Sequence, residues 1–477
     1  MRRRFLFILL LCALCASAHA QSLSTAPAAP PSIHGTPGQR LQSLLGLLVF
    51  LALTFALGQL RRRANRAFPR PRTILWGLAL MFLFAVFVLD TVSGQYFFDL
   101  MNRGVDKLLS YATEGARFVF GNLVYNNVPV GAPTGSPTMG PILSPTGYAS
   151  AGAFFAFNVL PTIIFFSSLA ALLYHVGIMQ YVVQALAWVM QKSMKTSGAE
   201  TLSAAANIFL GQTEAPLLVK PFIAGATNSE LMAIMVGGFA NIASGVLGAY
   251  VFMLKDFIPD VAGHLIAANV ISAPASLLVA KLLLPETATP ETAGGVRFRI
   301  DRIDANSIDA AARGALEGMT LSLNVAAMLI AFIALVAMAN SILAAAATAF
   351  GWQHVTLETI FGYVMSPLAW LTGVPWHDAK PIGTLLGIKT VLNEFVAYTV
   401  MSNNLAADRL YISPRSAVIT SYALCVFANF SSVAILFGGI SGMAPTRRSD
   451  LSRLGLIAMV GGALASFMTA CVVGVLL

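Results

Sequence analysis

One glutamate in an apolar chain limits what this protein can fold into. Glu214 lies in an apolar stretch that also contains Gly211, Pro216 and Pro221. A carboxylate at membrane depth costs about 2.5–3.5 kcal/mol on insertion scales, so it normally faces a cavity and serves a function. The glycine and prolines interrupt a helix and free backbone amides and carbonyls. These features predict a broken helix inside a membrane, which is typical of a solute-binding site.

A second glutamate has similar surroundings. Glu394 lies among apolar residues after Gly383 and Gly387. A short phrase follows each glutamate on the next apolar span, Phe-Ala-Asn-Ile-Ala-Ser at 239–244 and Phe-Ala-Asn-Phe-Ser-Ser at 427–432. The two units predict an internal duplication that supplies a pair of half-sites.

The composition assigns the chain to a broad class. Of the 477 residues, 57% are hydrophobic and only 10% are charged, which is typical of an all-α polytopic membrane protein. The formal net charge of +9 could suggest a nucleic-acid partner. Because the charges cluster in short loops between apolar spans, they indicate membrane topology instead, and we expect no nucleic-acid binding.

The N-terminal residues predict the orientation of the chain in the membrane. Residues 1–20 have the arginines, apolar run and Ala-His-Ala ending of a signal peptide, with an uncleaved first anchor as the alternative. Residues 21–40 are rich in Pro, Ala, Ser and Thr and read as a disordered periplasmic tether. Arginines at 61–72 and 447–453 then mark cytoplasmic loops. We therefore expect a bacterial inner-membrane protein with both mature termini in the periplasm.

Apolar runs and helix breakers divide the rest of the chain. We expect eight transmembrane helices, at about 42–60, 74–92, 153–177, 230–254, 258–284, 319–349, 415–441 and 455–477. Two re-entrant helical hairpins, at about 199–225 and 380–405, would enter from opposite sides and make the duplication an inverted repeat. An interfacial helix at 97–124 and an exposed loop at 126–150 complete the prediction.

The resulting domain organisation places a scaffold around two repeats. Each repeat contains one re-entrant hairpin and two spans. The predicted segments are N-terminal scaffold spans and interfacial helices at 41–195, a first repeat at 196–285, a cytoplasmic linker at 286–317, a scaffold span and outer-face helix at 318–376, and a second repeat at 377–477.

Three separated motifs resemble one transporter family. They are Gly-Gln-Thr-Glu-Ala-Pro at 211–216, Asn-Glu-Phe-Val-Ala-Tyr at 393–398 and Phe-Ala-Asn-Phe-Ser-Ser at 427–432. Together they resemble the concentrative nucleoside transporters, of the shorter bacterial type, over about 41–477. The resemblance implies eight spans, two hairpins in an inverted repeat, a homotrimer, and symport of nucleosides by alternating access without a cofactor.

The resemblance also implies a substrate site. On the first hairpin, Gln212, Thr213 and Glu214 would face the base, partly through water. Glu394 on the second hairpin would hold the ribose with Asn429 and Ser432, while Val246 and Phe427 would supply apolar walls. Without the resemblance, the glutamates could be packing groups, Asn429 an interhelical hydrogen-bonding residue, Phe427 a core residue, and Ser432 a donor to its own helix. We expect Lys220 and Lys389 to have interfacial or packing roles.

The coupling ion has a separate implied site. The resemblance gives Na⁺ four oxygen ligands, from the side chains of Asn207 and Asn241 and the carbonyls of Leu210 and Ile242, which suit a hard cation. Asn241 departs from the family, where a small hydroxyl residue is commoner at this position. Its bulk leaves proton coupling, with a glutamate as the carrier, as the alternative to Na⁺.

Two rival functions belong to other classes. Glu214 and Glu394 could be the acid and base of an intramembrane nucleoside hydrolase, since paired carboxylates are the usual equipment for that reaction. Their positions on hairpins that enter from opposite sides favour transport instead, so we do not expect an enzyme. A nucleoside sensor is disfavoured because the sequence shows no sizeable cytoplasmic domain.

Overall fold

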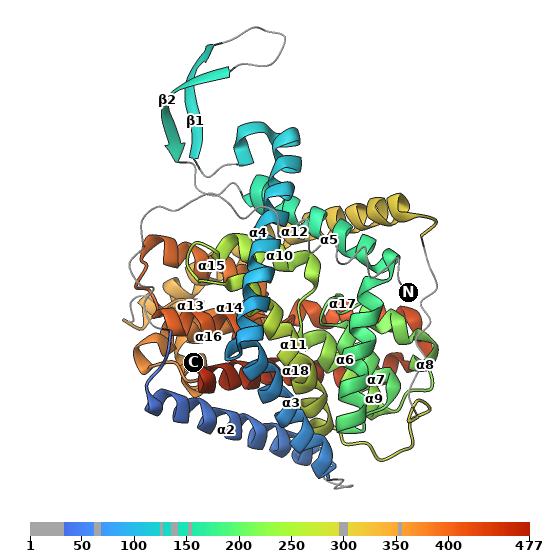
Figure 1. Cartoon of the computed structure of the whole chain (residues 1–477). Helices are drawn as coiled ribbons and strands as arrows, with labels where there is room; N and C mark the ends of the chain where they lie inside the picture. The colour runs from blue at the N-terminus through green and yellow to red at the C-terminus, as the bar shows by residue number, and fades with distance from the viewer. Residues whose placement is uncertain are drawn as a thin grey trace.

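The computed structural model describes residues 33–61, 68–124, 127–134, 142–150, 155–294, 304–351 and 355–477. These residues form a helical body, and one β-hairpin projects from it (Figure 1). The predicted signal peptide (1–20) and most of the predicted tether lie outside the described residues, as do segments 62–67 and 295–303. The predictions for those parts stay predictions.

The first three helices, α2, α3 and α4, begin earlier than the sequence predicts. The first helix starts at Pro37, inside the predicted tether, because proline is tolerated in the first turn of a helix. The interfacial helix predicted at 97–124 is present as a longer helix with one 3₁₀ turn. These elements are α2 (Pro37–Arg61), α3 (Pro71–Leu89), α4 (Val92–Phe120), η1 (Gly121–Val124), α5 (Phe155–Val176) and α6 (Ile178–Met194).

The segment predicted as a loop at 126–150 contains a β-hairpin. Strand β1 (Asn127–Thr134) pairs antiparallel with β2 (Ile142–Ser150), with a register irregularity between Val130 and Gly131. The prolines that favoured a loop are compatible with strands here, because both strands of a two-stranded sheet are edge strands. The loop prediction is therefore wrong here, while the rest of the described chain is helical as expected, and the hairpin extends beyond the helical body in Figure 1.

The two predicted repeats have the same order of elements. Each contains a pair of short segments that pack against each other, then a span broken in the middle, then a long helix. The first repeat comprises α7 (Gly198–Ala206), η2 (Ala215–Val219), α8 (Lys220–Ile223), α9 (Asn228–Ala240), α10 (Ser244–Leu254) and α11 (Val261–Leu283). The second comprises α14 (Trp376–Val391), α15 (Glu394–Ala407), α16 (Pro414–Leu424), α17 (Phe430–Met443), η3 (Pro445–Arg447) and α18 (Arg448–Leu476). This order supports the predicted duplication.

The shared Phe-Ala-Asn phrase does not occupy equivalent positions in the two repeats. Asn241 follows the last residue of α9 as its C-cap, in an extended conformation. Asn429 instead precedes α17 as its N-cap. The first break therefore spans 241–243 and the second spans 425–429. The phrase locates both breaks, but it aligns the repeats incorrectly by several residues.

A long helix and a shorter one connect the repeats. Helix α12 (Ser307–Ala349) packs against α5 (Figure 1), and α13 (Leu357–Leu371) packs against α14. Helix α12 starts inside the predicted linker at 286–317, because the Asn306 side chain accepts hydrogen bonds from the Ile308 and Asp309 amides and caps it. Only 12% of the most apolar stretch of α12 is buried, whereas 89% of the corresponding stretch of α11 is buried.

Seven stretches of helix in the described residues are long and apolar enough to cross a membrane. They correspond to seven of the eight predicted spans. The eighth, predicted at 415–441, is divided between α16 and α17, and α17 alone is a shorter apolar helix. The centre of the body is formed by α9, α11 and α18, which pack on one another. These central helices hold the broken spans in place.

Candidate functional site

Glu394 is buried and fixed by donors from two other segments. It is the first residue of α15, whose N-cap Asn393 accepts a hydrogen bond from the Val396 amide at 2.8 Å. The Tyr250 hydroxyl donates to Glu394 Oε1 at 2.9 Å, and Asn429 Nδ2 donates to Oε2 at 3.1 Å. A helix N-terminus also favours a negative charge. The carboxylate is therefore held at a point where α15, α10 and α17 meet. We call the paired short segments hairpin 1 (α7, η2 and α8) and hairpin 2 (α14 and α15).

Asn429 combines a structural role with a contact to this carboxylate. Its Oδ1 accepts hydrogen bonds from the Ser432 amide at 2.8 Å and the Ser431 hydroxyl at 2.7 Å, which caps α17. Its Nδ2 is then directed to Glu394. Ser432 is buried in the first turn of α17, beside the same cap. The predicted residues Glu394, Asn429 and Ser432 are thus brought together.

The two residues predicted as apolar walls lie on segments that contribute to this cluster. Val246 and Tyr250 are four residues apart on α10, so their side chains share one face of the helix. Val246 is buried. Phe427 is half-buried, packs against the core, and lies two residues before Asn429 in the second break. Both apolar residues therefore belong to segments that hold the carboxylate, α10 through Tyr250 and the second break through Asn429.

The tip of hairpin 1 rests on α9 and α17. A methyl group added to Gly238 would lie 3.3 Å from Gln212 Cβ and 3.2 Å from Leu436 Cδ1. One added to Gly439 would lie 2.9 Å from Thr213 Cγ2. Two glycines thus allow Gln212 and Thr213 to approach closely. Because a helix rises 1.5 Å per residue, Leu436 lies about 10 Å along α17 from its N-cap.

Two polar groups at this tip remain available. Gln212 is 7% exposed, and its Oε1 is buried without a hydrogen-bond partner in the described part of the chain. Glu214 is exposed, and its Oε2 accepts a hydrogen bond from the Gly211 amide at 3.2 Å. No direct hydrogen bond joins Glu214 to Glu394 or Asn429 among the described residues. The structure therefore gives two polar clusters, both on α17, and not one pair of touching glutamates.

Asn207 has an open oxygen at the end of α9. It is the C-cap of α7, and its Nδ2 donates to the Ser203 carbonyl at 3.0 Å. Its Oδ1 is buried without a hydrogen-bond partner among the described residues. A methyl group added to Gly237, in the last turn of α9, would lie 3.3 Å from Asn207 Nδ2. The predicted ligand Leu210 ends the following turn, with its amide bonded to Ala206 at 2.8 Å.

The other two predicted ion ligands already accept hydrogen bonds. Asn241 Oδ1 accepts from the Ser272 hydroxyl at 2.6 Å. The Ile242 carbonyl accepts from Asn269 Nδ2 at 3.0 Å, and the same amide group donates to the Ile208 carbonyl at 3.0 Å. A carbonyl oxygen has two lone pairs, so each can still bind one cation. The neutral oxygens of this cluster suit a hard monovalent cation in donor type.

Sequence reasoning missed two residues of these clusters. Tyr250 holds Glu394, and Asn269 of α11 joins the break in α9–α10 to hairpin 1. A buried asparagine in an otherwise apolar span was a signal for Asn269. Tyr250 lies in an ordinary apolar run, and only its spacing of four residues from Val246 could have indicated it.

The two lysines expected to be interfacial or packing residues differ from each other. Lys220, at the start of α8, is exposed. Lys389 is fully buried in the last turn of α14. An interfacial role is therefore wrong for Lys389, because a snorkelling lysine keeps its ammonium in water.

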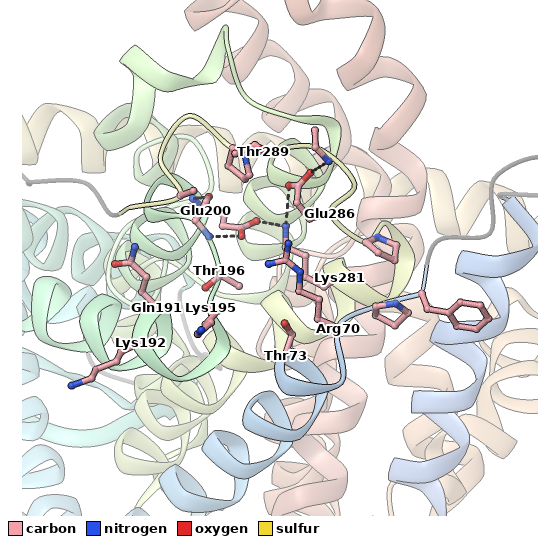
Figure 2. A pocket seen from close by; sticks show the side chains of 17 residues that line it. Arg70, Thr73, Gln191, Lys192, Lys195, Thr196, Glu200, Lys281, Glu286 and Thr289 are labelled. Atoms are coloured by element: carbon pink, nitrogen blue, oxygen red, sulfur yellow. Dashed lines mark hydrogen bonds and ion pairs between the residues drawn. The ribbon is translucent and has the colours of Figure 1, made fainter.

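A separate cavity of about 550 Å³ lies beside the start of hairpin 1 (Figure 2). It contains a buried ion pair between Lys281 Nζ and Glu200 Oε2 at 2.5 Å, with Glu286 Oε2 at 3.7 Å from the same ammonium. Figure 2 shows Lys281 between the two carboxylates. Neither Glu214 nor Glu394 lines this cavity, so it is not the predicted substrate site.

The same ionic cluster fixes the start of hairpin 1. Ser197 and Glu200 form a capping box on α7, and Thr227 and Glu230 form another on α9. The Ser197 hydroxyl also donates to Glu230 Oε1 at 2.6 Å, which joins the two helix starts. Because Lys281 lies on α11, these contacts connect hairpin 1, α9 and α11.

Comparisons with family models cover most of the chain. Residues 45–123 match the model described as the N-terminus of Na⁺-dependent nucleoside transporters, and residues 264–474 match the corresponding C-terminus. Residues 156–257 match the model Gate, described as nucleoside recognition.

Individual relatives agree with the family models. The chain is 42% identical to an uncharacterized transporter, YutK, of Bacillus subtilis (strain 168), over 91% of this chain and 98% of the relative. It is 39% identical to sodium/nucleoside cotransporter 1 of Mus musculus, over 92% of this chain and 64% of that longer protein. Among solved structures, CNTnw in an inward-facing substrate-bound state superposes with a TM-score of 0.78 at 40% identity, over 92% of this chain and 97% of that chain.

Proposed function

The chain belongs to the family of Na⁺-dependent nucleoside transporters, and on this premise we propose that it imports nucleosides by Na⁺ symport with alternating access. Its relatives are transporters, and the chain is a transporter and not an enzyme. The hydrolase hypothesis is therefore dropped. One Na⁺ entering across 100 mV contributes about 2.3 kcal/mol to uptake before any concentration gradient is counted.

The observation that carries the proposal is the Glu394 carboxylate held between Tyr250 and Asn429. A nucleoside is neutral and presents ribose hydroxyls, which are donors. A buried carboxylate is a strong acceptor and forms short, charge-assisted hydrogen bonds with such groups. In this proposal Glu394, Asn429 and Ser432 bind the ribose.

The base would lie toward the tip of hairpin 1. The buried Gln212 Oε1 lacks a partner in the described residues and can accept from a base amino or imino group. Thr213 and Glu214 would complete the base contacts, partly through water. Val246 and Phe427 would pack on the flat rings. The separation of about 10 Å along α17 between the two clusters suits a ligand whose two polar ends differ.

The coupling ion would bind where α7 ends and α9 breaks. Asn207 Oδ1 is the oxygen ligand that has no hydrogen bond, and Leu210, Asn241 and Ile242 supply the remaining oxygens. One observation favours proton coupling as the second candidate. Asn241 and Ile242 already accept hydrogen bonds, so a Na⁺ ion must share their oxygens with Ser272 and Asn269.

The membrane arrangement belongs to the same proposal. Eight spans and two oppositely inserted re-entrant hairpins would place both mature termini in the periplasm of a bacterial inner membrane. The two hairpins and broken spans would move together against the scaffold spans and expose the site to each side in turn. The apolar and largely uncovered α12 would supply the contact between protomers of a homotrimer.

Counterflow in proteoliposomes tests this function. Purified protein is reconstituted with unlabelled nucleoside inside, labelled uridine or adenosine is added outside, and Na⁺ and pH are varied independently. We expect the intact nucleoside to accumulate and uptake to rise with Na⁺ at constant pH. Uptake that follows pH and ignores Na⁺ would establish proton coupling, and no counterflow of any nucleoside would contradict the proposal.

Asn207→Ala tests the ion site itself. Loss of the open amide oxygen should raise the Na⁺ concentration for half-maximal uptake at least tenfold, because it removes one ligand of about four. The matched control is Asn102→Ala, whose amide bonds Asp260 and the Gly263 amide away from the site. If the Na⁺ dependence of uptake is unchanged in Asn207→Ala, the ion does not bind at Asn207.

A further inference from the structure

Lys389 is a buried cation that interacts with the Glu394 carboxylate only at a distance and not in a direct ion pair. Its side chain is fully buried, and no ion pair of Lys389 is present in the described part of the chain. Its Nζ donates to the Ala423 carbonyl at 3.0 Å and lies 4.8 Å from the ring centroid of Phe467. Burying an ammonium is costly unless other groups compensate for its lost hydration. The compensation here comes from the Ala423 carbonyl, the face of Phe467 and the more distant charge of Glu394.

That carbonyl belongs to the broken end of α16. The last four carbonyls of a helix lack partners within the helix and carry its partial negative charge. Here each has a donor. The Tyr398 hydroxyl donates to the Ser421 carbonyl at 2.6 Å. The Cys425 amide donates to the Tyr422 carbonyl at 3.3 Å, and the Val426 amide donates to the Leu424 carbonyl at 2.7 Å. The remaining carbonyl, of Ala423, is bonded by Lys389. The ammonium therefore neutralises a helix end at the centre of the second repeat.

The first repeat has a corresponding position. There the first half of the broken span is α9, and its last turn contacts the side chain of Asn207. Asn207 caps the first helix of hairpin 1, as Lys389 lies in the last turn of the first helix of hairpin 2. At the α9 end, the described side-chain contacts come from neutral amides and a hydroxyl, and Asn207 Oδ1 is open. This is where the proposed coupling ion would bind.

We propose that the Lys389 ammonium is a built-in cation, which occupies in the second repeat the position that the mobile ion takes in the first. The inference rests on the ion site of the proposed function. Each break would then require one positive charge near the end of the helix that precedes it, α9 in the first repeat and α16 in the second. The first repeat would bind a Na⁺ ion from solution, whereas the second has the ammonium of Lys389. Lys389 is a positioning residue that keeps the break at 425–429, and with it the contact between Asn429 and Glu394, in its binding geometry.

Chemical rescue separates the charge from the side-chain volume. Lys389→Ala should lower nucleoside uptake at least tenfold, and millimolar ethylammonium should restore part of it by entering the vacated space. Ethanol, a neutral molecule of similar size, should not. Lys220→Ala, which removes an exposed lysine of the same protein, is the control and should transport normally. Equal rescue by ethanol, or normal uptake by Lys389→Ala, would overturn the inference.

A second variant covers the case in which Lys389→Ala does not fold. Lys389→Gln keeps a donor for the Ala423 carbonyl but removes the charge. We expect thermal unfolding of purified Lys389→Gln to gain a second, weaker response to Na⁺ that the unaltered protein lacks. A single Na⁺ response identical to that of the unaltered protein would refute the built-in cation. If the proposed Na⁺ site in the first repeat is itself wrong, a different experiment shows it, because the Na⁺ titration of uptake will then be unchanged in Asn207→Ala.

Discussion

Replacing Glu394 by glutamine changes its charge and little else. The site can accommodate the amide, because Oε of the glutamine can accept from Asn429 Nδ2 while its Nε2 donates to the Tyr250 hydroxyl, which accepts as well as donates. The N-cap by Asn393 is unaffected. Glu394→Gln should therefore fold and assemble as the unaltered protein does.

The expected loss of affinity follows from the hydrogen bonds to the substrate. A hydrogen bond to a charged group contributes about 1.5–3 kcal/mol, and a neutral one about 0.5–1.5 kcal/mol, so each ribose hydroxyl loses about 1–1.5 kcal/mol. Two hydroxyls together lose about 2–3 kcal/mol, which corresponds to an increase in Kd of about 30- to 140-fold. Because glutamine has nearly the same shape as glutamate, this substitution tests the charge of residue 394 and not its packing.

The assay is equilibrium binding of a labelled nucleoside to purified protein in saturating Na⁺, with thermal unfolding measured in parallel. Glu358→Gln is the matched control, because Glu358 also accepts from an asparagine, Asn340, but lies at the start of α13. We expect the control to bind within about twofold of the unaltered protein. If Glu394→Gln binds within threefold of it while remaining folded, the ribose assignment is refuted.

Three further predictions concern other parts of the structure. Lys281→Met leaves the Glu200 carboxylate buried without its partner and should cost about 3–5 kcal/mol of stability, measured as a lower unfolding temperature. Adding Glu200→Gln should restore part of that stability, and no restoration would show that the ion pair is not the cause. Gly439→Ala places a methyl group 2.9 Å from Thr213 Cγ2 and should weaken nucleoside binding several-fold; Thr213→Ser in the same chain removes that contact, and failure to restore binding would contradict the packing argument. A cysteine in a C-terminal extension should react with an impermeant maleimide in spheroplasts without permeabilisation, whereas labelling only after permeabilisation would reverse the proposed topology.

The sequence located the two glutamate-containing segments because their signals are local. A carboxylate in an apolar run, with glycine or proline nearby, is visible without any tertiary information, as at Glu214 and Glu394. The partners of these residues are not visible in that way. Tyr250 reaches Glu394 from a helix 144 residues earlier in the chain, and its only local signal is the spacing of four residues from Val246.

Local signals also misled at particular places. Prolines at 129, 133 and 145 favoured a loop where edge strands form. The repeated Phe-Ala-Asn phrase suggested an alignment that the caps contradict, because one asparagine ends a helix and the other begins one. Lys389 looked like an ordinary snorkelling lysine, since a sequence does not show which carbonyl lies within reach of a long side chain.

The two hydrogen-bonding roles of the Asn429 side chain limit how this protein can evolve. The same amide starts α17 through its oxygen and holds Glu394 through its nitrogen. In the proposed site, a substitution that changes how Asn429 and Glu394 bind the ribose would therefore also disturb the first turn of α17. If the proposed base contacts are correct, changes of nucleoside preference are expected instead at Gln212 and Thr213, whose side chains cap no helix.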